Sequence, residues 1–230
     1  MMLKKRKSSL IILSALLSGV LVTSGFMIVK ELSSQQKEKE DFRKLAEIVT
    51  GIPTEHPETN TWLIDESVAE ETPIGQNLSK LFAMNADCIG WLCIPGTAVD
   101  YPVMHTPENP QKYLRRNFYG EYSQSGVPFL DGRCSLDCDN LIIYGHNMKN
   151  GTMFSDLKRY ADQSFRSEHP IIELVTAGGK QIYTVSDIRI TDTSDKWYSE
   201  INPKSGRFLT LSTCYGNSKN GRLLVIAKET

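Results

Sequence analysis

The sequence predicts a mostly β domain with some helix, built as a closed or nearly closed barrel, with helices ahead of it and an apolar helix at the N-terminus. Three observations support this fold class. Short apolar runs separated by turn residues dominate from residue 88 onward, without the strand–helix–strand rhythm of a parallel sheet. Residues 73–85 have helical periodicity, and residues 8–29 contain no charged side chain.

The N-terminus has the pattern of a membrane anchor. Residues 1–7 carry four basic side chains, and the uncharged run of residues 8–29 follows directly. A helix of this length spans about 30 Å, the thickness of the hydrocarbon core of a bilayer. Because basic residues stay on the cytoplasmic side, we expect residues 1–7 inside, a single transmembrane anchor at 8–29, and the rest outside the cell. A cleaved signal peptide is the alternative, although no clear cleavage site follows the run.

The next part of the chain links the predicted anchor to the domain. Residues 31–49 are charged and loosely helical, and residues 51–72 contain several prolines and acidic residues, so residues 30–72 are predicted to be a juxtamembrane helix and linker. Pro73 suits the first turn of a helix. The catalytic domain is predicted to span residues 73–230.

Eight strands are predicted within the domain, on the basis of β-branched and apolar runs bounded by turns. Two short helices are expected between them, at 110–116 and 153–160, and the long connection 191–207 is expected to be either functional or helical. The predicted strands are 89–94, 99–104, 127–130, 141–144, 171–175, 181–190, 208–213 and 223–227.

Composition excludes several functions. The chain has 230 residues and a net charge of −1, which gives no reason to expect a nucleic-acid partner. It contains no glycine-rich phosphate loop and no paired-cysteine zinc pattern, so neither a metal nor a cofactor is predicted. Of the five cysteines, Cys88, Cys93, Cys134 and Cys138 are expected to be reduced, with local disulfides as the alternative.

The residues with the chemistry of a nucleophilic site lie near the C-terminus. Cys214 ends the predicted strand 208–213, and Arg222 opens the next one across a short turn. If the two strands pair, a thiol and a guanidinium meet. Because a free cysteine has a pKa of about 8.5, the thiol needs a partner to act at neutral pH.

Histidine is the natural partner for this thiol. His146 differs from the other three histidines because it follows the apolar strand 141–144 through a Tyr-Gly-His turn, so its imidazole is also delivered at a strand end. A lone cysteine–histidine pairing is a weak signal, and by itself it leaves open an inert buried cysteine and a structural histidine.

Several ordered blocks together resemble the sortases. The block Thr-Leu-Ser-Thr-Cys at 210–214, with Arg222 opening the next strand, is similar to the active-site signature of that family. The block Asn-Leu-Ile-Ile-Tyr-Gly-His at 140–146 resembles the histidine segment of the class B branch, and 94–104 and 122–131 resemble upstream strands of that family. The resemblance covers residues 89–228.

This resemblance implies an eight-stranded sortase-type barrel, with N-terminal helices and a helix in the long loop before the last two strands. It also implies a cysteine transpeptidase in which Cys214 attacks, His146 transfers protons and Arg222 holds the oxyanion. A class B member would cut a C-terminal sorting motif of the Asn-Pro-x-Thr type after Thr. It would then join the surface protein to a peptidoglycan cross-bridge or lipid II amine.

The same blocks suggest further substrate-binding residues. Ser212 lies two residues before Cys214, on the same face of the strand, and Tyr144 has the same relation to His146. Asn109 lies in a loop that matches the family only loosely. Ordinary structural hydrogen bonding is the alternative for all three.

Three other functions remain open at this point. The acceptor could be a pilin lysine, which would make the enzyme a polymerising sortase. A surface binding domain with a decayed site is a second possibility, although the presence of Cys214, His146 and Arg222 argues against decay. A thiol redox protein would need a resolving cysteine near Cys214, and residues 215–230 contain none.

Overall fold

The computed structural model describes the backbone of residues 2–51 and 73–230, and the side chains of residues 17–51 and 77–230. Two compact units make up the chain, Met1–Arg43 and Lys44–Thr230. The predicted linker at 51–72 lies almost wholly outside the described residues.

One helix, α1 (Met2–Thr50), forms the described part of the first unit and continues into the second. Its last turns, from residue 44, belong to the second unit. The predicted anchor and the predicted juxtamembrane helix are therefore parts of one continuous helix. Among the described residues, no helix is at once long enough and apolar enough to cross a bilayer. The anchor at 8–29 begins among residues whose side chains are not described, and it stays a prediction.

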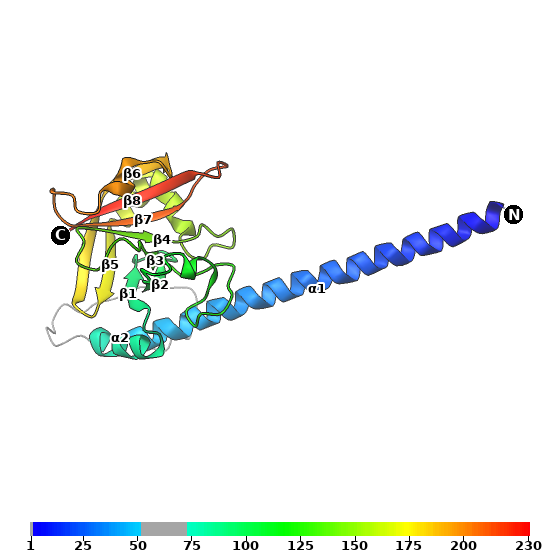
Figure 1. Ribbon diagram of the computed structural model, residues 1–230, viewed down its shortest axis with the longest axis horizontal. Coiled ribbons are helices and arrows are strands. Elements are labelled where there is room, and N and C mark those ends of the chain that lie inside the picture. Colours follow the sequence, from blue (N-terminus) through cyan, green and yellow to red (C-terminus); the bar gives the residue numbers. More distant parts are fainter. Residues whose placement is uncertain (1, 52–72) are drawn as a thin grey trace. The chain divides into compact units, whose positions relative to one another are not determined.

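The second unit is a closed barrel of eight strands (Figure 1). Around the barrel the strands follow the order β1-β2-β3-β4-β7-β8-β6-β5. All neighbours are antiparallel except the pairs β2/β3 and β4/β7. The strands are β1 (Cys88–Cys93), β2 (Asp100–Met104), β3 (Phe129–Leu130), β4 (Asn140–Tyr144), β5 (Ile171–Thr176), β6 (Gly179–Asp192), β7 (Phe208–Cys214) and β8 (Gly221–Glu229).

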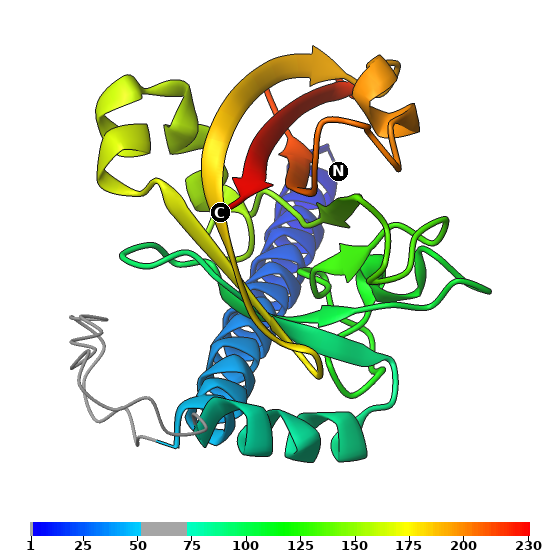
Figure 2. The ribbon, with the colours of Figure 1, turned by 90° about the vertical axis from the view of Figure 1, so that its left-hand side faces the viewer.

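The sequence prediction of eight strands is confirmed, and the largest differences in their bounds concern β6 and β8, each of which extends two residues beyond its prediction at both ends. β6 shows why. It pairs with β5 through residues 179–184 and with β8 through residues 183–192. Figure 2 shows it as a long curved strand beside β8. Because backbone pairing with β8 continues past the apolar run, β6 extends beyond the predicted 181–190.

Strands β4, β7 and β8 form the part of the barrel that positions the site. β7 is buried along its length except at Cys214. Its side chains alternate between the barrel interior, where Leu209 and Leu211 are fully buried, and an outer face that carries Phe208, Thr210 and Ser212. That outer face is also covered, as described below.

The helices outside α1 are short. α2 (Pro73–Met84) matches its predicted range, and the predicted helices at 110–116 and 153–160 are the 3-10 helices η1 (Lys112–Arg115) and η2 (Ser155–Ala161). The helix α3 (Gln163–Glu168) was not predicted; Asp162 caps it by accepting a hydrogen bond from the Ser164 amide. The connection between β6 and β7 contains only the 3-10 helix η3 (Lys196–Ser199).

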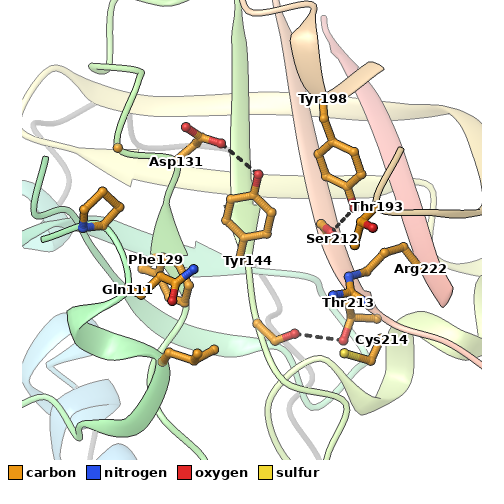
Figure 3. A pocket seen from close by; sticks show the side chains of 14 residues that line it. Gln111, Phe129, Asp131, Tyr144, Thr193, Tyr198, Ser212, Thr213, Cys214 and Arg222 are labelled. Carbon is orange, nitrogen blue, oxygen red and sulfur yellow. Dashed lines mark hydrogen bonds between the residues drawn. The ribbon is translucent and has the colours of Figure 1, made fainter. Parts of the chain in front are cut away.

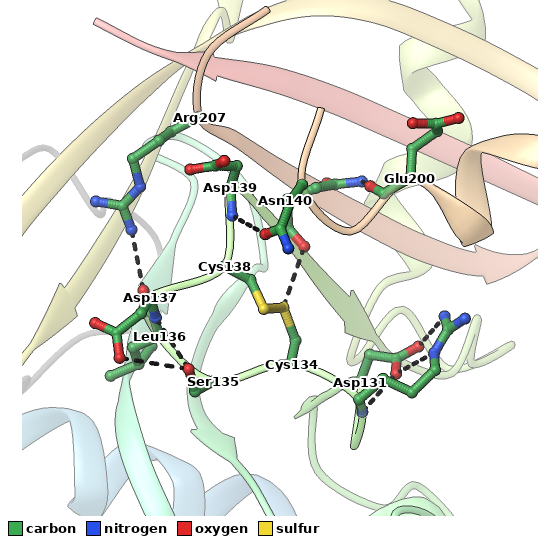
Figure 4. Close-up of a disulfide and its surroundings, with 12 residues drawn as sticks. Asp131, Cys134, Ser135, Leu136, Asp137, Cys138, Asp139, Asn140, Glu200 and Arg207 are labelled. Atoms are coloured by element: carbon green, nitrogen blue, oxygen red, sulfur yellow. Dashed lines mark hydrogen bonds and ion pairs between the residues drawn. A yellow bond between two sulfur atoms is a disulfide. The ribbon is translucent and has the colours of Figure 1, made fainter. Parts of the chain in front are cut away.

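The cysteines require a correction. Cys134 and Cys138 form a disulfide (Figure 4). Cys88, Cys93 and Cys214 are free. The expectation that the first four cysteines are all reduced was therefore wrong for one pair. The turn between β3 and β4 brings the two α-carbons to 5.7 Å, well within the range that a disulfide requires.

Candidate active site

Strand register brings the predicted catalytic positions to one end of the barrel. In the antiparallel pair β7/β8, Cys214 lies directly opposite Arg222. In the parallel pair β4/β7, Tyr144 lies opposite Ser212, two residues before Cys214. β4 ends at Tyr144, and the turn that follows brings His146 to the same end of the barrel at which Cys214 follows Ser212.

Cys214 is exposed because the cover over β7 ends just before it. Trp197 and Tyr198, in the connection between β6 and β7, pack on a cluster formed by Phe208, Leu224 and Ile226. The Tyr198 hydroxyl and Ser212 Oγ are hydrogen-bonded at 2.7 Å. The next side chain along this face is that of Cys214, which is exposed.

The thiol opens into a pocket of about 460 Å³ (Figure 3). Cys214 and Arg222 lie at one side of it, and the aromatic rings of Tyr144 and Tyr198 form much of its wall. The two rings stack with centroids 6.2 Å apart and planes 14° apart. The lining residues are Pro110, Gln111, Leu114, Phe129, Asp131, Gly132, Tyr144, Gly145, Thr193, Tyr198, Ser212, Thr213, Cys214 and Arg222.

The guanidinium of Arg222 has hydrogen-bond donors that are not used by the residues that the structure describes. Its Nη1 donates to the carbonyl oxygens of Gly221 at 2.9 Å and Lys219 at 3.2 Å. No carboxylate in the described part of the chain forms an ion pair with it. The other nitrogens of the fork are therefore available to an oxygen of a bound molecule.

The His146 imidazole is half-buried, and its Nε2 lies 2.9 Å from the carbonyl oxygen of Leu114. A carbonyl only accepts, so Nε2 carries the proton and donates it, which leaves Nδ1 unprotonated in the neutral ring. Burial lowers the pKa of His146, the bond to Leu114 opposes this, and the nearby Arg115 charge lowers the pKa further. His146 is not among the residues that line the pocket, although Leu114 and Gly145 are.

The turn that carries His146 is fastened to β7. Gly145 N donates to Ser212 O at 3.1 Å, and Thr213 Oγ1 donates to Gly145 O at 2.8 Å. Asn147 Nδ2 donates to the carbonyl oxygen of Cys214 at 3.0 Å. A Cβ at position 145 would lie 2.6 Å from the buried ring of Phe154, so only glycine fits between Tyr144 and His146.

The three predicted substrate-binding residues have different positions. Ser212 and Tyr144 line the pocket, and each has a structural partner, Tyr198 for Ser212 and Asp131 for Tyr144. Asn109 does not line the pocket, although Pro110 and Gln111 after it do. The Asn109 backbone accepts hydrogen bonds from Thr106 Oγ1 and the Lys112 amide, which are the contacts of a turn.

Sequence reasoning did not identify several residues of the pocket. Asp131 follows the buried strand β3, and the residue is 8% exposed. An acidic residue directly after the apolar pair Phe129–Leu130 was the available signal. Thr193 and Tyr198 reach the pocket from the long connection, whose aromatic residues could have been surface residues that simply pack on the barrel.

A thiol and a guanidinium at the pocket, with an imidazole on the adjoining turn, are the groups of a cysteine acyl-transfer enzyme. Comparison with known proteins gives the family. The family model "Sortase domain" matches residues 92–230, so this chain belongs to the sortase family.

Individual relatives place the chain in class B. It is 28% identical to sortase B of Staphylococcus aureus, over 97% of this chain and 98% of the relative. It is 37% identical to sortase B of Listeria monocytogenes over 128 residues; that match covers 54% of this chain and half the length of the relative.

Solved structures agree with this assignment. A Staphylococcus aureus sortase B–substrate complex superposes with a TM-score of 0.68 and 26% identity, covering 86% of this chain and 98% of that one. Sortase B of Clostridium perfringens gives a TM-score of 0.59 and 28% identity, covering 66% and 99%. The eight-stranded barrel is thus the fold of class B sortases.

Proposed function

We propose that this chain is a membrane-anchored cysteine transpeptidase that cuts a C-terminal sorting motif of the Asn-Pro-x-Thr type after Thr and joins the Thr carbonyl to a cell-wall amine. The observation that carries the proposal is the pairing of Cys214 with Arg222 across β7/β8, at the edge of the pocket. The pocket is an open cleft walled by aromatic and hydroxyl side chains, which suits an extended peptide.

In the first half-reaction the imidazole of His146 takes the proton of the Cys214 thiol, and the resulting thiolate attacks the Thr carbonyl carbon. A C–S bond forms, and the carbonyl oxygen becomes an oxyanion. The guanidinium of Arg222 lies across the strand pair from the sulfur, with free donors to bind this charge. Collapse of this tetrahedral intermediate breaks the C–N bond, and the departing amine takes a proton from the imidazole of His146. A thioester on Cys214 remains.

In the second half-reaction an amine attacks the thioester carbon. The attacking nitrogen gives its proton to His146, the C–S bond breaks, and the thiolate of Cys214 is regenerated. The imidazole of His146 thus regains a proton in place of the one that it gave to the departing amine. The acceptor in this proposal is a peptidoglycan cross-bridge or lipid II amine, and the donor is a surface protein with a C-terminal sorting signal.

The location follows from the N-terminus. The basic residues 4–7 precede the uncharged run 8–29, a pattern that favours a single membrane span with the catalytic unit outside the cell. An enzyme that joins surface proteins to the cell wall needs this position. N-terminal sequencing of the chain recovered from a membrane fraction tests it, and a mature start near residue 24 would contradict an uncleaved anchor.

The activity is tested by mass spectrometry of the full-length chain mixed with sorting peptides and candidate amines. We expect cleavage after Thr, a thioester on Cys214 and an amide-linked product. Cys214→Ala should remove turnover, and Arg222→Ala should lower kcat about 10²- to 10³-fold. Cys93→Ala and Arg116→Lys are matched controls that should retain activity.

The same mixture identifies the acceptor. A cell-wall amine should be consumed in preference to a lysine side chain of a pilin-type peptide, and the reverse preference would make the enzyme a polymerising sortase. Undiminished cleavage by Cys214→Ala would exclude the proposed mechanism altogether.

A further inference from the structure

An ion pair between the buried Asp131 and the exposed Arg133 lies at the far side of the pocket from the thiol. The Asp131 carboxylate accepts hydrogen bonds from Arg133 Nε at 2.9 Å and Arg133 Nη2 at 2.8 Å, and also from the Arg133 amide at 3.0 Å. Its backbone amide donates to the carbonyl oxygen of Ile142, two residues before Tyr144. Since His146 lies two residues after Tyr144, Asp131 and the catalytic end lie on opposite sides of that tyrosine (Figure 3).

This pair contacts both aromatic walls of the pocket. The Tyr144 hydroxyl donates to Asp131 Oδ2 at 2.7 Å, and Arg133 Nη2 donates to the carbonyl oxygen of Tyr198 at 2.7 Å. The Tyr198 hydroxyl is held in turn by Ser212. A continuous series of bonds therefore runs from β4 through the ion pair to the connection between β6 and β7, and then back to β7.

The segment that carries the pair is itself fixed. Cys134 N donates to Asp131 O at 3.1 Å, and the disulfide to Cys138 closes the following turn (Figure 4). Arg207 Nη2 donates to the carbonyl oxygen of Leu136 at 3.0 Å in the same turn. The ion pair is thus anchored on a constrained segment, as a positioning element requires.

We propose that Asp131 and Arg133 are positioning residues that hold the Tyr144 and Tyr198 rings in their stacked arrangement, and so set the affinity for the part of the peptide that lies away from the scissile bond. Neither residue reaches Cys214, so the reactivity of the thiol itself does not depend on them. This inference rests on the proposed function, because the peptide is its substrate.

Two measurements on the full-length chain test the inference, and the first needs no turnover. The ¹³Cζ resonance of Tyr144, assigned by its loss in Tyr144→Phe, reports the hydrogen bond of that hydroxyl. We expect Asp131→Asn to shift it. Asp137→Asn, an exposed carboxylate in the same turn, should leave it unchanged. An unshifted resonance in Asp131→Asn would overturn the inference.

The second measurement is the kinetics of peptide cleavage. Asp131→Asn and Arg133→Gln should raise KM about three- to thirtyfold with little change in kcat, and Arg133→Lys should restore part of the affinity. The rate at which iodoacetamide alkylates Cys214 should equal that of the unmutated chain. A fall in kcat or in the alkylation rate with KM unchanged would overturn the positioning role.

The variants also separate this inference from the proposed function. Asp131→Asn and Tyr144→Phe break the same bond, so their effects on KM should be less than additive. Additive effects would refute the link through Tyr144. If the unmutated chain cleaves no sorting peptide at all, the proposed function fails. The Tyr144 resonance then still tests whether Asp131 binds the Tyr144 hydroxyl.

Discussion

Burial and the Arg115 charge both lower the pKa of the His146 imidazole from the ordinary value of about 6.5. Arg115→Gln removes the charge and leaves the burial unchanged. We therefore expect this variant to raise the pKa of His146. The measurement is the pH titration of the imidazole C–H resonances by NMR.

Arg116→Gln is the matched control, because Arg116 is the next residue and its guanidinium is bonded to the carbonyl oxygen of Gly120. It should leave the titration of His146 where it is in the unmutated chain. A His146 pKa that falls in Arg115→Gln would show that the guanidinium acts on the ring in some way other than through its charge.

Asp131 makes the stability of the domain depend on pH in the acidic range. Burial alone would raise the pKa of this carboxyl, but the bonds from Arg133 and Tyr144 outweigh it and lower the pKa to about 2. The unfolded value is about 3.9, so the stabilisation is complete above that value and is lost as the pH falls toward 2. Because Arg133 is 54% exposed, we expect only on the order of 1 to 2 kcal/mol at neutral pH.

Urea unfolding at several pH values, followed by tryptophan fluorescence, measures this contribution. The stability difference between the unmutated chain and Asp131→Asn should be largest above pH 5 and should shrink by pH 2. A difference that stays constant over this range would mean that the carboxylate charge does not stabilise the fold.

At the scale of single residues, the sequence indicated those whose position on a strand determines where they lie. Cys214, Arg222, Ser212 and Tyr144 all lie at or near strand ends, and the alternation of a strand places them on one face. Asp131 was not predicted, because its partners depend on which strands are neighbours. The contact of His146 with the Leu114 carbonyl is tertiary in the same way.

At the scale of elements, the connection between β6 and β7 is held on the barrel by a buried polar relay. Trp197 Nε1 donates to Thr210 Oγ1, which donates to Asn140 Oδ1, both at 2.8 Å. Asn140 Nδ2 also donates to the carbonyl oxygen of Glu200. Thr210→Val keeps the shape of the side chain and leaves the buried Asn140 amide oxygen and the half-buried Trp197 indole without this partner, which should cost about 1–3 kcal/mol of stability.

Urea unfolding measures this loss, and Trp197 fluorescence should shift as the indole loses its acceptor. Thr184→Val, an exposed threonine on β6, is the control and should change stability by less than about 0.5 kcal/mol. Equal stability of the two variants would show that the relay does not hold the connection in place.

The strands were predictable because each contains a short apolar run between turns. β6 is longer than predicted, since its last residues are half-exposed or exposed and are ordered by pairing with β8. The family resemblance implied a helix in the following connection, where this chain forms only a single 3-10 turn. The relay through Trp197 and Asn140 fixes that segment without a longer helix.

At the scale of the whole molecule, barrel closure was predicted, but the order of the strands was not. β4 and β7 pair in parallel across more than sixty residues of intervening chain. No local pattern encodes such a pairing. The disulfide was missed for a related reason, because only the folded turn brings Cys134 and Cys138 to bonding distance.

The end of α1 belongs to the second unit, and this predicts where the domain can be cut. Leu45 and Val49 are 0% and 3% exposed, and Asn77 Nδ2 of α2 donates to the carbonyl oxygen of Val49 at 3.4 Å. A chain that starts at residue 44 keeps these contacts, whereas one that starts at residue 52 loses them. Burying two such side chains stabilises a fold by on the order of 2–5 kcal/mol.

We therefore expect the chain from residue 44 to melt at the temperature of the full-length chain, and the chain from residue 52 to melt several degrees lower. Thermal unfolding followed by circular dichroism compares the three. Leu45→Ala in the full-length chain distinguishes lost packing from an effect of the new terminus, since it removes one side chain and leaves α1 intact. If the chain from residue 52 and Leu45→Ala both melt with the full-length chain, the last turns of α1 do not stabilise the barrel.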